Sequence, residues 1–445
     1  MTLSTLQPVH DVIGVGFGPS NLALAIFLQE QAQRTGKPLD ALFIERQQHY
    51  RWHGDTLASQ SELQISFLKD LVSMRNPTSP YSFVNYLNQQ GRLVDFINLG
   101  TFYPCRMEFN DYLRWVAEQF SEQAAYGEQV LRIEPATGSG AIDTLKVICR
   151  AANGREHTRL TRSVVVGTGG TAKIPEQFAA FKDDPRVFHH SRYLSGIRNL
   201  PCAQGQPMRI AIIGSGQSAA EAFIDLHDSY PQVRAEMIFR ASALKPADST
   251  PFVNEIFAPA ATDLMFGHSE QARRQLLEEY QNTNYSVVDA ELISRIYGVL
   301  YRQKVARQQR HAVLCRQQVE HAQGDAEGIS LTLRDLNSGE QRSERYDAVV
   351  LATGYERNTH RDLLAPLHGL LQDCQVDREY RALAAPALKA PIFLQGFCED
   401  SHGLSDTLLS VLPIRSAEIG QALQRALGRS AAPSEAPDRV ALASA

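Results

Sequence analysis

Two stretches of the chain share one order of features: a short apolar run, a glycine-rich turn, and an apolar pattern with helical spacing. In the first stretch, residues 11–16 predict a buried strand, the residues from Pro19 onward predict a helix, and residues 41–45 predict a second strand. In the second stretch, a strand is predicted over 209–213, a helix follows, and the next strand covers 236–239. Each stretch therefore predicts a β-α-β unit of a parallel sheet.

Weaker patterns fill much of the remaining chain. Helical spacing over residues 109–120 and 287–303 predicts two further helices, and Ser79-Pro80 predicts the start of another, because proline is tolerated in a first helical turn. Residues 51–80 are polar and irregular, and a stretch of that length without an obvious element usually carries function. Residues 245–285 form a second long polar stretch. Short strands are predicted over residues 130–133, 145–148, 164–166, 329–333 and 347–351.

The composition fits a globular protein of two or three domains. The 445 residues are 43% hydrophobic and 21% charged, with a net charge of -5, a balance without the basic surface of a nucleic-acid-binding protein. No window is apolar over the ~20 residues that a membrane span requires, and residues 1–10 lack the features of a secretion signal. We therefore expect a cytoplasmic protein with no nucleic-acid partner and no membrane span; the sequence leaves its oligomeric state open, and a homo-oligomer is one expectation.

The cysteines and histidines argue against disulfide-redox and metal chemistry. The six cysteines are widely separated, so the chain has no CxxC pair, and ordinary reduced thiols are expected. The 13 histidines form no metal-binding pattern, and the adjacent His189 and His190 would point to opposite faces of a strand. No metal site is predicted.

The first glycine-rich turn predicts a dinucleotide site. Gly14 and Gly16 would let the backbone approach a pyrophosphate, and the N-terminus of the following helix would stabilise its charge. Pro19 stands where such turns commonly have a third glycine, which a first helical turn tolerates. Glu45, at the end of the next strand, could accept hydrogen bonds from both ribose hydroxyls.

The second glycine-rich turn predicts a site of different preference. Gly214 and Gly216 are followed by Ala219, a small residue that allows close packing of the helix. The residue after the second strand is Arg240 rather than an acid, and a guanidinium suits a ribose 2′-phosphate. This site is therefore expected to take NADPH rather than NADH, and a chain with two dinucleotides is expected to pass electrons between them.

A third motif, near the C-terminus, is more specific. Residues 347–355, with His360 beyond them, fit the pattern D-x3-[FL]-A-T-G-Y-x4-[HP] of the flavin-dependent N-hydroxylating monooxygenases. Together with six further segments, this motif makes nearly the whole chain resemble that family, and within it the branch that hydroxylates the N5 amine of L-ornithine in pyoverdine-type siderophore pathways. The six segments are residues 11–22, 64–71, 76–83, 251–257, 282–286 and 402–410.

The resemblance implies an α/β fold with two dinucleotide-binding Rossmann-like domains, the NADP domain being inserted in a discontinuous FAD domain, and a small substrate-binding region. The strand at 347–351 is expected to return to the first domain. The expected boundaries are 1–200 for the first part of the FAD domain, 206–335 for the NADP domain with a substrate-contacting insert around 245–303, 340–428 for the return of the FAD domain with a substrate-site helix, and 429–445 for a disordered tail.

The resemblance also implies roles for individual residues. For FAD they are Gly14, Gly16, Pro19, Glu45, Trp52, His53, Gln64, Val130, Thr407, Leu408 and Leu409. For NADP they are Gly214, Ser215, Gly216, Gln217, Ser218, Arg240, Asn284, Tyr285 and Ser286. For the amino acid they are Lys69, Asn254, Glu255, Ile256, Phe257 and Ser410, with Lys69 expected to pair with the substrate carboxylate. Asn284 is the expected catalytic residue.

The implied reaction uses NADPH, FAD and O2. It converts L-ornithine to N5-hydroxy-L-ornithine through a C4a-hydroperoxyflavin, as the first step of hydroxamate siderophore biosynthesis. An L-lysine N6-hydroxylase remains an alternative, since one methylene changes the free energy of substrate binding by only ~1–3 kcal/mol. A non-enzymatic NADPH sensor is a second alternative. A disulfide reductase would need a CxxC, which is absent, and a Baeyer–Villiger oxygenase would need the linker glycine and tryptophan that residues 187–193 lack.

Overall fold

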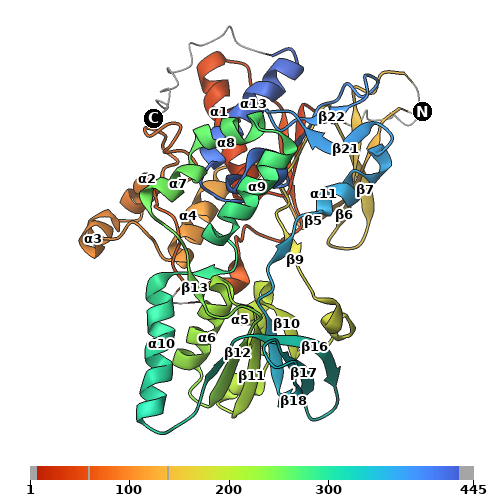
Figure 1. Ribbon diagram of the computed structural model, residues 1–445. Helices are drawn as coiled ribbons and strands as arrows, with labels where there is room; N and C mark the ends of the chain where they lie inside the picture. The colour runs from red at the N-terminus through yellow and green to blue at the C-terminus, as the bar shows by residue number, and fades with distance from the viewer. Residues whose placement is uncertain (1–7, 59–60, 138–139, 430–445) are drawn as a thin grey trace.

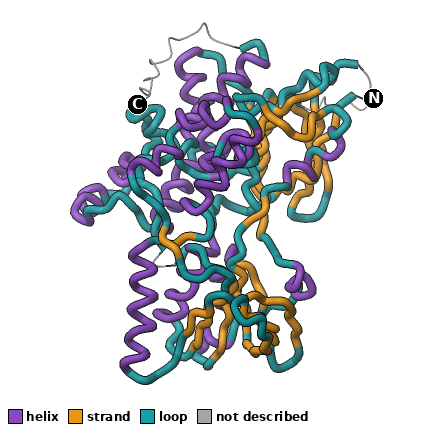
Figure 2. Tube along the Cα trace, in the orientation of Figure 1, coloured by secondary structure: helices purple, strands orange, loops and turns teal. Residues whose placement is uncertain are grey.

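The fold is built around two parallel sheets, each with a helical layer. The computed structural model describes residues 8–58, 61–137 and 140–429, so the expected tail at 429–445 lies outside the described residues except for Arg429. The first sheet occupies the upper half of Figure 1 and the second the lower half, and Figure 2 shows most helical turns gathered above and to the left of the strands. No helix in the described ranges is long and apolar enough to cross a membrane.

The first sheet has five parallel strands in the order β23-β8-β2-β3-β4. Their bounds are β2 Val12–Val15, β3 Ala41–Glu45, β4 Ala124–Tyr126, β8 Val164–Val166 and β23 Ile392–Leu394. Helix α1 (Pro19–Thr35) joins β2 to β3 and packs against α13 (Leu412–Ala426). The contact is close, because a Cβ on Gly420 would lie 2.3 Å from the ring of Phe27.

A smaller sheet and several helices complete this half of the molecule. The sheet has the order β1-β7-β6-β5, with a parallel β1–β7 pair and antiparallel pairs elsewhere. Its strands are β1 Val9–His10, β5 Glu128–Pro135, β6 Leu145–Ala151 and β7 Glu156–Thr161. The remaining elements are α2 Phe83–Gln89, α3 Leu93–Leu99, α4 Arg106–Glu118, α11 Thr359–Leu363, β21 Leu371–Val376 and β22 Ala382–Ala384.

The second sheet also has five parallel strands, in the order β10-β19-β11-β12-β15. They are β10 Val187–His189, β11 Met208–Ile213, β12 Val233–Ile238, β15 Ala312–Leu314 and β19 Ala348–Leu351. The core on one face includes residues of α5 (Tyr193–Arg198), α6 (Gln217–Ser229) and α10 (Ala290–Val305). The core on the other face includes residues of an antiparallel sheet of β16 Gln317–Gly324, β17 Ile329–Asp335 and β18 Gln341–Tyr346.

The chain crosses between the two halves along a short ribbon. Strand β9 (Thr171–Ala172) leads out of the first half, β20 (Tyr355–Glu356) leads back, and the two pair antiparallel. In Figure 1, β9 lies between the upper and lower sheets. The second half is therefore held to the first by two adjacent strands on one side.

A helical insert leaves the second half and leans on the first. It contains α7 Pro251–Asn254, α8 Pro259–Gly267 and α9 Glu270–Tyr280, between the paired strands β13 Lys245–Pro246 and β14 Val287–Val288. Helices α8 and α9 pack against α12 (Glu399–His402) of the first half. The polar stretch 245–285 is therefore largely helical, which its weak apolar periodicity did not indicate.

Two expectations from the sequence are wrong. Strand β19 does not return to the first sheet: it pairs with β10 and β11, and β23 makes the return instead. An apolar run predicts a buried strand but not the sheet that the strand joins. Because β10 pairs with β19, residues 187–189 also belong to the second sheet. The helix expected from Ser79-Pro80 begins at Phe83, because the Ser82 side chain accepts from the Asn85 N–H as its N-cap.

Candidate active site

The first glycine turn is shaped to receive a phosphate group. Gly16 has φ +83°, and a Cβ there would lie 2.8 Å from the Gly167 carbonyl oxygen. A Cβ on Gly14 would meet the Phe43 ring at 2.4 Å, whereas one on Gly18 would have no neighbour within 4 Å. Gly18 is the N-cap of α1 and offers no side-chain cap, so the first N–H groups of the helix stay available to an anion.

Buried amides hold this turn in place. Asn21 on α1 is fully buried, and its Nδ2 donates to the Gly16 carbonyl at 2.7 Å. Its Oδ1 accepts from Gln395 Nε2 at 2.9 Å, directly after β23. The turn therefore depends on residues from both ends of the chain.

Glu45 ends β3 beside this turn, as the sequence predicted. Its Oε2 accepts from the Phe17 N–H at 3.0 Å and its Oε1 from the Gln47 N–H at 2.9 Å. The carboxylate is thus fixed at the end of β3, with lone pairs left for ribose hydroxyls.

A buried ion pair anchors the loop that contains Thr407, Leu408 and Leu409. Arg415 on α13 binds Asp406 Oδ1 at 2.8 Å, and the two side chains are 1% and 0% exposed. The same guanidinium donates to Ser20 Oγ in the first turn of α1 at 3.0 Å. The loop is therefore held against the helix that begins at the glycine turn.

The second glycine turn repeats the design with different neighbours. A Cβ on Gly214 would lie 2.3 Å from the Ala352 carbonyl oxygen, and one on Gly216 would lie 3.6 Å from Ser286 Cα. Helix α6 begins at Gln217 behind Gly216, again with no side-chain cap. Ser215 and Ser218 are half-buried beside it, and Arg240 is exposed two residues beyond the end of β12.

Residues expected at the two nucleotide sites contact one another across the boundary between the halves. Tyr285 Oη donates to Glu399 Oε2 at 2.5 Å and lies 3.5 Å from Thr407 Oγ1. Gln64 and Gln217 both donate to the carboxylate of Asp289, at 3.3 and 2.9 Å. The structure therefore brings the expected FAD and NADP sets together at one seam.

An aromatic cluster lies at the same seam. His53 makes edge contacts with Trp52 and Tyr355, at ring-centroid distances of 4.9 and 6.2 Å. The His53 side chain is exposed, and its pKa is lowered to about 4 by desolvation from the surrounding protein and by the charges of Arg106 and Arg357. The ring is therefore neutral at physiological pH, and two cations, Arg106 and Arg357, lie near enough to influence it.

The expected substrate residues are only partly brought together. Residues Glu255–Phe257 form a short 3-10 helix that lies against the 3-10 turn Leu404–Thr407, which precedes the buried Ser410. Asn254 is exposed, and its Nδ2 donates to the Ser249 carbonyl at 2.9 Å. No hydrogen bond or ion pair within the described ranges joins the Lys69 side chain to these residues.

The surroundings of Lys69 provide no carboxylate partner among the described residues. It is half-buried, and desolvation lowers its pKa from the ordinary value. The neighbouring Asp70 accepts instead from the N–H groups of Val72, Ser73 and Phe83. Since no described carboxylate pairs with Lys69, a ligand carboxylate would be a favourable partner.

The comparisons with known proteins agree with this geometry. The family model described as L-lysine 6-monooxygenase/L-ornithine 5-monooxygenase matches residues 8–357. The chain belongs to this family. It is 63% identical over 428 residues to the L-ornithine N(5)-monooxygenase of Pseudomonas aeruginosa, covering 96% of each chain.

Solved structures of this family show the same fold. An ornithine hydroxylase from Pseudomonas aeruginosa superposes with a TM-score of 0.91 at 62% identity, over 94% of this chain and 100% of that one. The ornithine N-hydroxylase of Kutzneria sp. 744, solved with reduced FAD, NADP⁺ and L-ornithine, gives a TM-score of 0.88 at 37% identity, over 94% and 99%. These enzymes confirm the expected fold of two dinucleotide-binding domains, and they favour an enzyme over the NADPH-sensor interpretation.

The two cofactors of this family fit the residues present. Both helix starts are free of side-chain caps, and the two cradles are too tight for any residue but glycine at Gly16 and Gly214. A different cluster, Glu128, Cys149 and His157, has the spacing of metal ligands. However, both oxygens of Glu128 bind the Arg159 guanidinium, at 2.6 and 3.1 Å, which places a positive charge beside the cluster.

The structure adds residues that the sequence analysis missed. Asn21 and Gln395 hold the first glycine turn, Arg415 anchors the 406–410 loop, and the charges of Arg106 and Arg357 help to lower the pKa of His53. The sequence contains a signal for one of these residues. Arg415 lies on the apolar face of α13, at helical spacing from Leu412, Ile419 and Leu423. A cation on such a face is rarely unpaired.

Proposed function

We propose that this protein hydroxylates the side-chain amine of L-ornithine to N5-hydroxy-L-ornithine, using NADPH, FAD and O2. The proposal rests on one structural observation. Two helices begin directly after glycine turns without a side-chain cap, and residues expected at the two nucleotide sites meet at the Tyr285–Thr407 contact. The 63% identity to an L-ornithine N(5)-monooxygenase supports ornithine over the longer lysine. The product would supply the hydroxamate group of a siderophore.

FAD would lie against the first sheet. When bound, it accepts a hydride and activates O2. Gly14, Gly16 and Pro19 would hold its pyrophosphate, and Glu45 its ribose. Trp52, His53, Gln64, Val130 and Thr407–Leu409 would enclose the rest. This placement assigns the first sheet, including β23, to the FAD domain and the second sheet, including β10 and β19, to the NADP domain.

NADPH would bind along the second turn. Gly214–Ser218 would hold the pyrophosphate, Arg240 the 2′-phosphate, and Asn284–Ser286 the nicotinamide end. Asn284 is half-buried and neutral, so it can hold the nicotinamide ribose and exclude water from the reacting centre without adding charge. With Asn284→Ala, we expect more H2O2 released per NADPH oxidised; an unchanged ratio would remove this role.

The amino acid must present an uncharged amine. An ammonium group with pKa ~10.4 costs ~4 kcal/mol to deprotonate at about pH 7.4. A carboxylate beside it would raise that cost, whereas neutral acceptors would not. We therefore place the Lys69 cation at the substrate carboxylate and neutral groups at the amine. Asn254, whose Nδ2 is bound to Ser249, keeps its carbonyl oxygen as an acceptor. Residues Glu255–Phe257 and Ser410 would complete the pocket.

Product analysis tests the function directly. The purified protein is incubated with NADPH, O2 and either ornithine or lysine, and hydroxylated amine is measured beside NADPH consumed. We expect near-stoichiometric hydroxylation with ornithine and mainly H2O2 with lysine. Equal hydroxylation of lysine would favour the N6-hydroxylase, and no hydroxylamine with either amino acid would reject the proposal.

We also propose a reducing, cytoplasmic setting and a homo-oligomer. The six cysteines are free thiols, which suits a reducing compartment. Helix α3 exposes Val94, Ile97 and Leu99 at 68, 65 and 69%, a cluster of apolar surface that often marks an interface. Sedimentation of the native protein, compared with an Ile97→Lys variant, would test the second proposal: a monomeric native protein rejects it.

A further inference from the structure

An ion pair crosses the seam between the two halves. The Arg106 guanidinium, at the start of α4 in the first half, binds both oxygens of Glu221 on α6 in the second half, each at 2.9 Å. The side chains are only 16% and 7% exposed. Bidentate arginine–carboxylate contacts are geometrically demanding, so this pair fixes the orientation of its two helices as well as their distance.

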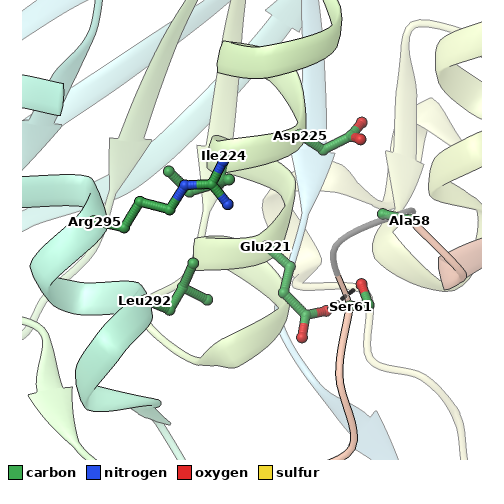
Figure 3. A pocket seen from close by; sticks show the side chains of 7 residues that line it. All are labelled: Ala58, Ser61, Glu221, Ile224, Asp225, Leu292 and Arg295. Carbon is green, nitrogen blue, oxygen red and sulfur yellow. Dashed lines mark hydrogen bonds between the residues drawn. The ribbon is translucent and has the colours of Figure 1, made fainter. Parts of the chain in front are cut away.

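The carboxylate depends on groups from both halves. Ser61 Oγ donates to Glu221 Oε2 at 3.4 Å, and the Arg106 N–H donates to the Ser61 carbonyl at 2.8 Å. Figure 3 shows Glu221 and Ser61 facing each other, with Ile224 and Asp225 further along α6. The cavity beside them measures only ≈ 20 Å³, room for about one water.

The same carboxylate is linked to the second glycine turn. Gln217, the first residue of α6, donates to Glu221 Oε1 at 3.0 Å and to Asp289 Oδ2 at 2.9 Å. Its Oε1 accepts from the Asp289 N–H at 3.0 Å. A side chain at the phosphate-binding end of α6 therefore shares the network that joins the halves.

The covalent connection between the two halves does not by itself fix their relative orientation. On one side, the halves are joined by the ribbon of β9 and β20, which is two residues long in each strand. Such a short ribbon tethers the second half without fixing its rotation. The orientation must therefore be set by other contacts between the halves. These include the packing of α8 and α9 against α12 and, at the seam, the Arg106–Glu221 pair, which is bidentate and largely buried.

We propose that the Arg106–Glu221 ion pair is a latch between the two domains, which holds the NADP domain in the orientation needed for hydride transfer to FAD. The proposal rests on the proposed function. Glu221 and Arg106 are here positioning residues for that step, and the link through Gln217 couples the latch to the nucleotide-binding turn. Burial raises the pKa of Glu221 above its ordinary value, and the charge of Arg106 opposes that shift.

The test compares two isosteric variants on one helix. Glu221→Gln removes the charge of the latch, whereas Asp225→Asn, one turn further along α6, alters a carboxylate that binds Tyr193 and Ser229 within the same half. Both enzymes are purified with FAD, and the anaerobic reduction of FAD by NADPH is followed in a single turnover. Glu221→Gln should slow reduction about tenfold to a hundredfold, as expected for misplaced reactants, and Asp225→Asn should stay within about twofold of the native rate.

A second readout does not depend on activity. Hydrogen–deuterium exchange should accelerate in residues 61–64 and 217–221 of Glu221→Gln, and not of Asp225→Asn, if the seam opens. A native reduction rate in Glu221→Gln, or equal exchange in the two variants, would overturn the latch. If Glu221→Gln fails to retain FAD, Arg106→Lys replaces it, with an intermediate loss of rate expected because the charge remains but the bidentate contact does not.

These measurements distinguish a failure of the latch proposal from a failure of the proposed function. If the native protein reduces FAD with NADPH but yields no hydroxylated amine, the function fails and the latch comparison still stands. If ornithine is hydroxylated and Glu221→Gln reduces FAD at the native rate, only the latch fails.

Discussion

The two glycine turns look alike in sequence but are supported in different ways. The turn at Gly16 is held by Asn21, Gln395 and the Arg415–Asp406 pair, all within the first half of the molecule. The helix behind Gly216 begins at Gln217, whose amide is shared with Asp289 and Glu221 at the seam. The first turn is thus supported from within one half of the molecule, and the second is supported in part by contacts at the boundary.

Under the proposed function, this difference suits a bound flavin at the first turn and an exchanging co-substrate at the second. A cofactor that stays bound through many cycles benefits from a site that is rigid before binding. A co-substrate that enters and leaves in each cycle can use a site whose support includes contacts that open and close. Substitutions in the first set of contacts should therefore lower both the stability of the fold and the FAD content. Substitutions in the second set should lower reaction rates.

The largest effect is expected from Arg415→Met. It leaves the buried carboxylate of Asp406 without its cation, which costs roughly 3–5 kcal/mol. We expect a clear fall in Tm and loss of FAD during purification, measured by the flavin absorbance per protein. Arg425→Met is the matched control on α13, since its pair with Glu379 is 49 and 47% exposed. FAD retained at the native level in Arg415→Met would mean that the loop does not depend on this pair.

The next effect concerns substrate rather than cofactor. Lys69→Met keeps the aliphatic stem but removes the cation, and a hydrogen bond to a charged group is worth about 1.5–3 kcal/mol. We expect the KM for ornithine to rise about tenfold or more while NADPH oxidation continues with H2O2 as its product. The exposed Lys182→Met is the control. Normal ornithine saturation in Lys69→Met would refute the assignment.

Arg240→Gln should have a smaller effect, confined to the second site. Arg240 is exposed, so its contact with a phosphate would be screened by solvent. We expect the preference for NADPH over NADH in kcat/KM to fall about tenfold, or about 1.4 kcal/mol, with FAD content unchanged. The control is Arg307→Gln, also exposed but beyond the end of α10. An unchanged ratio of kcat/KM for NADPH to kcat/KM for NADH would show that another residue binds the 2′-phosphate.

The sequence predicted what local pattern controls. The β-α-β units around Gly14 and Gly214 follow from apolar runs and turn glycines, and both are where they were expected. The sheet joined by β19 could not be predicted, because an apolar strand of four residues fits either sheet. The Arg106–Glu221 pair could not be predicted either, since nothing local links two residues so far apart in the chain. Arg415 could have been found, because a cation on an apolar helix face demands a buried partner.

The smallest effect is a dependence on pH that separates two groups in the substrate site. The Lys69 cation exists below its pKa, which desolvation lowers, so it should be lost at a lower pH than an ordinary lysine. The KM for ornithine should therefore rise severalfold as the pH is raised through that pKa. The reacting amine changes in the opposite sense, because deprotonation creates its nucleophilic form, so kcat should rise over the same range. Steady-state kinetics of the native enzyme and Lys69→Met at several alkaline pH values separate the two: the rise in KM should vanish in the variant, while the rise in kcat should remain. A KM that climbs equally in both enzymes would place the titrating group elsewhere and leave the substrate carboxylate without an assigned partner.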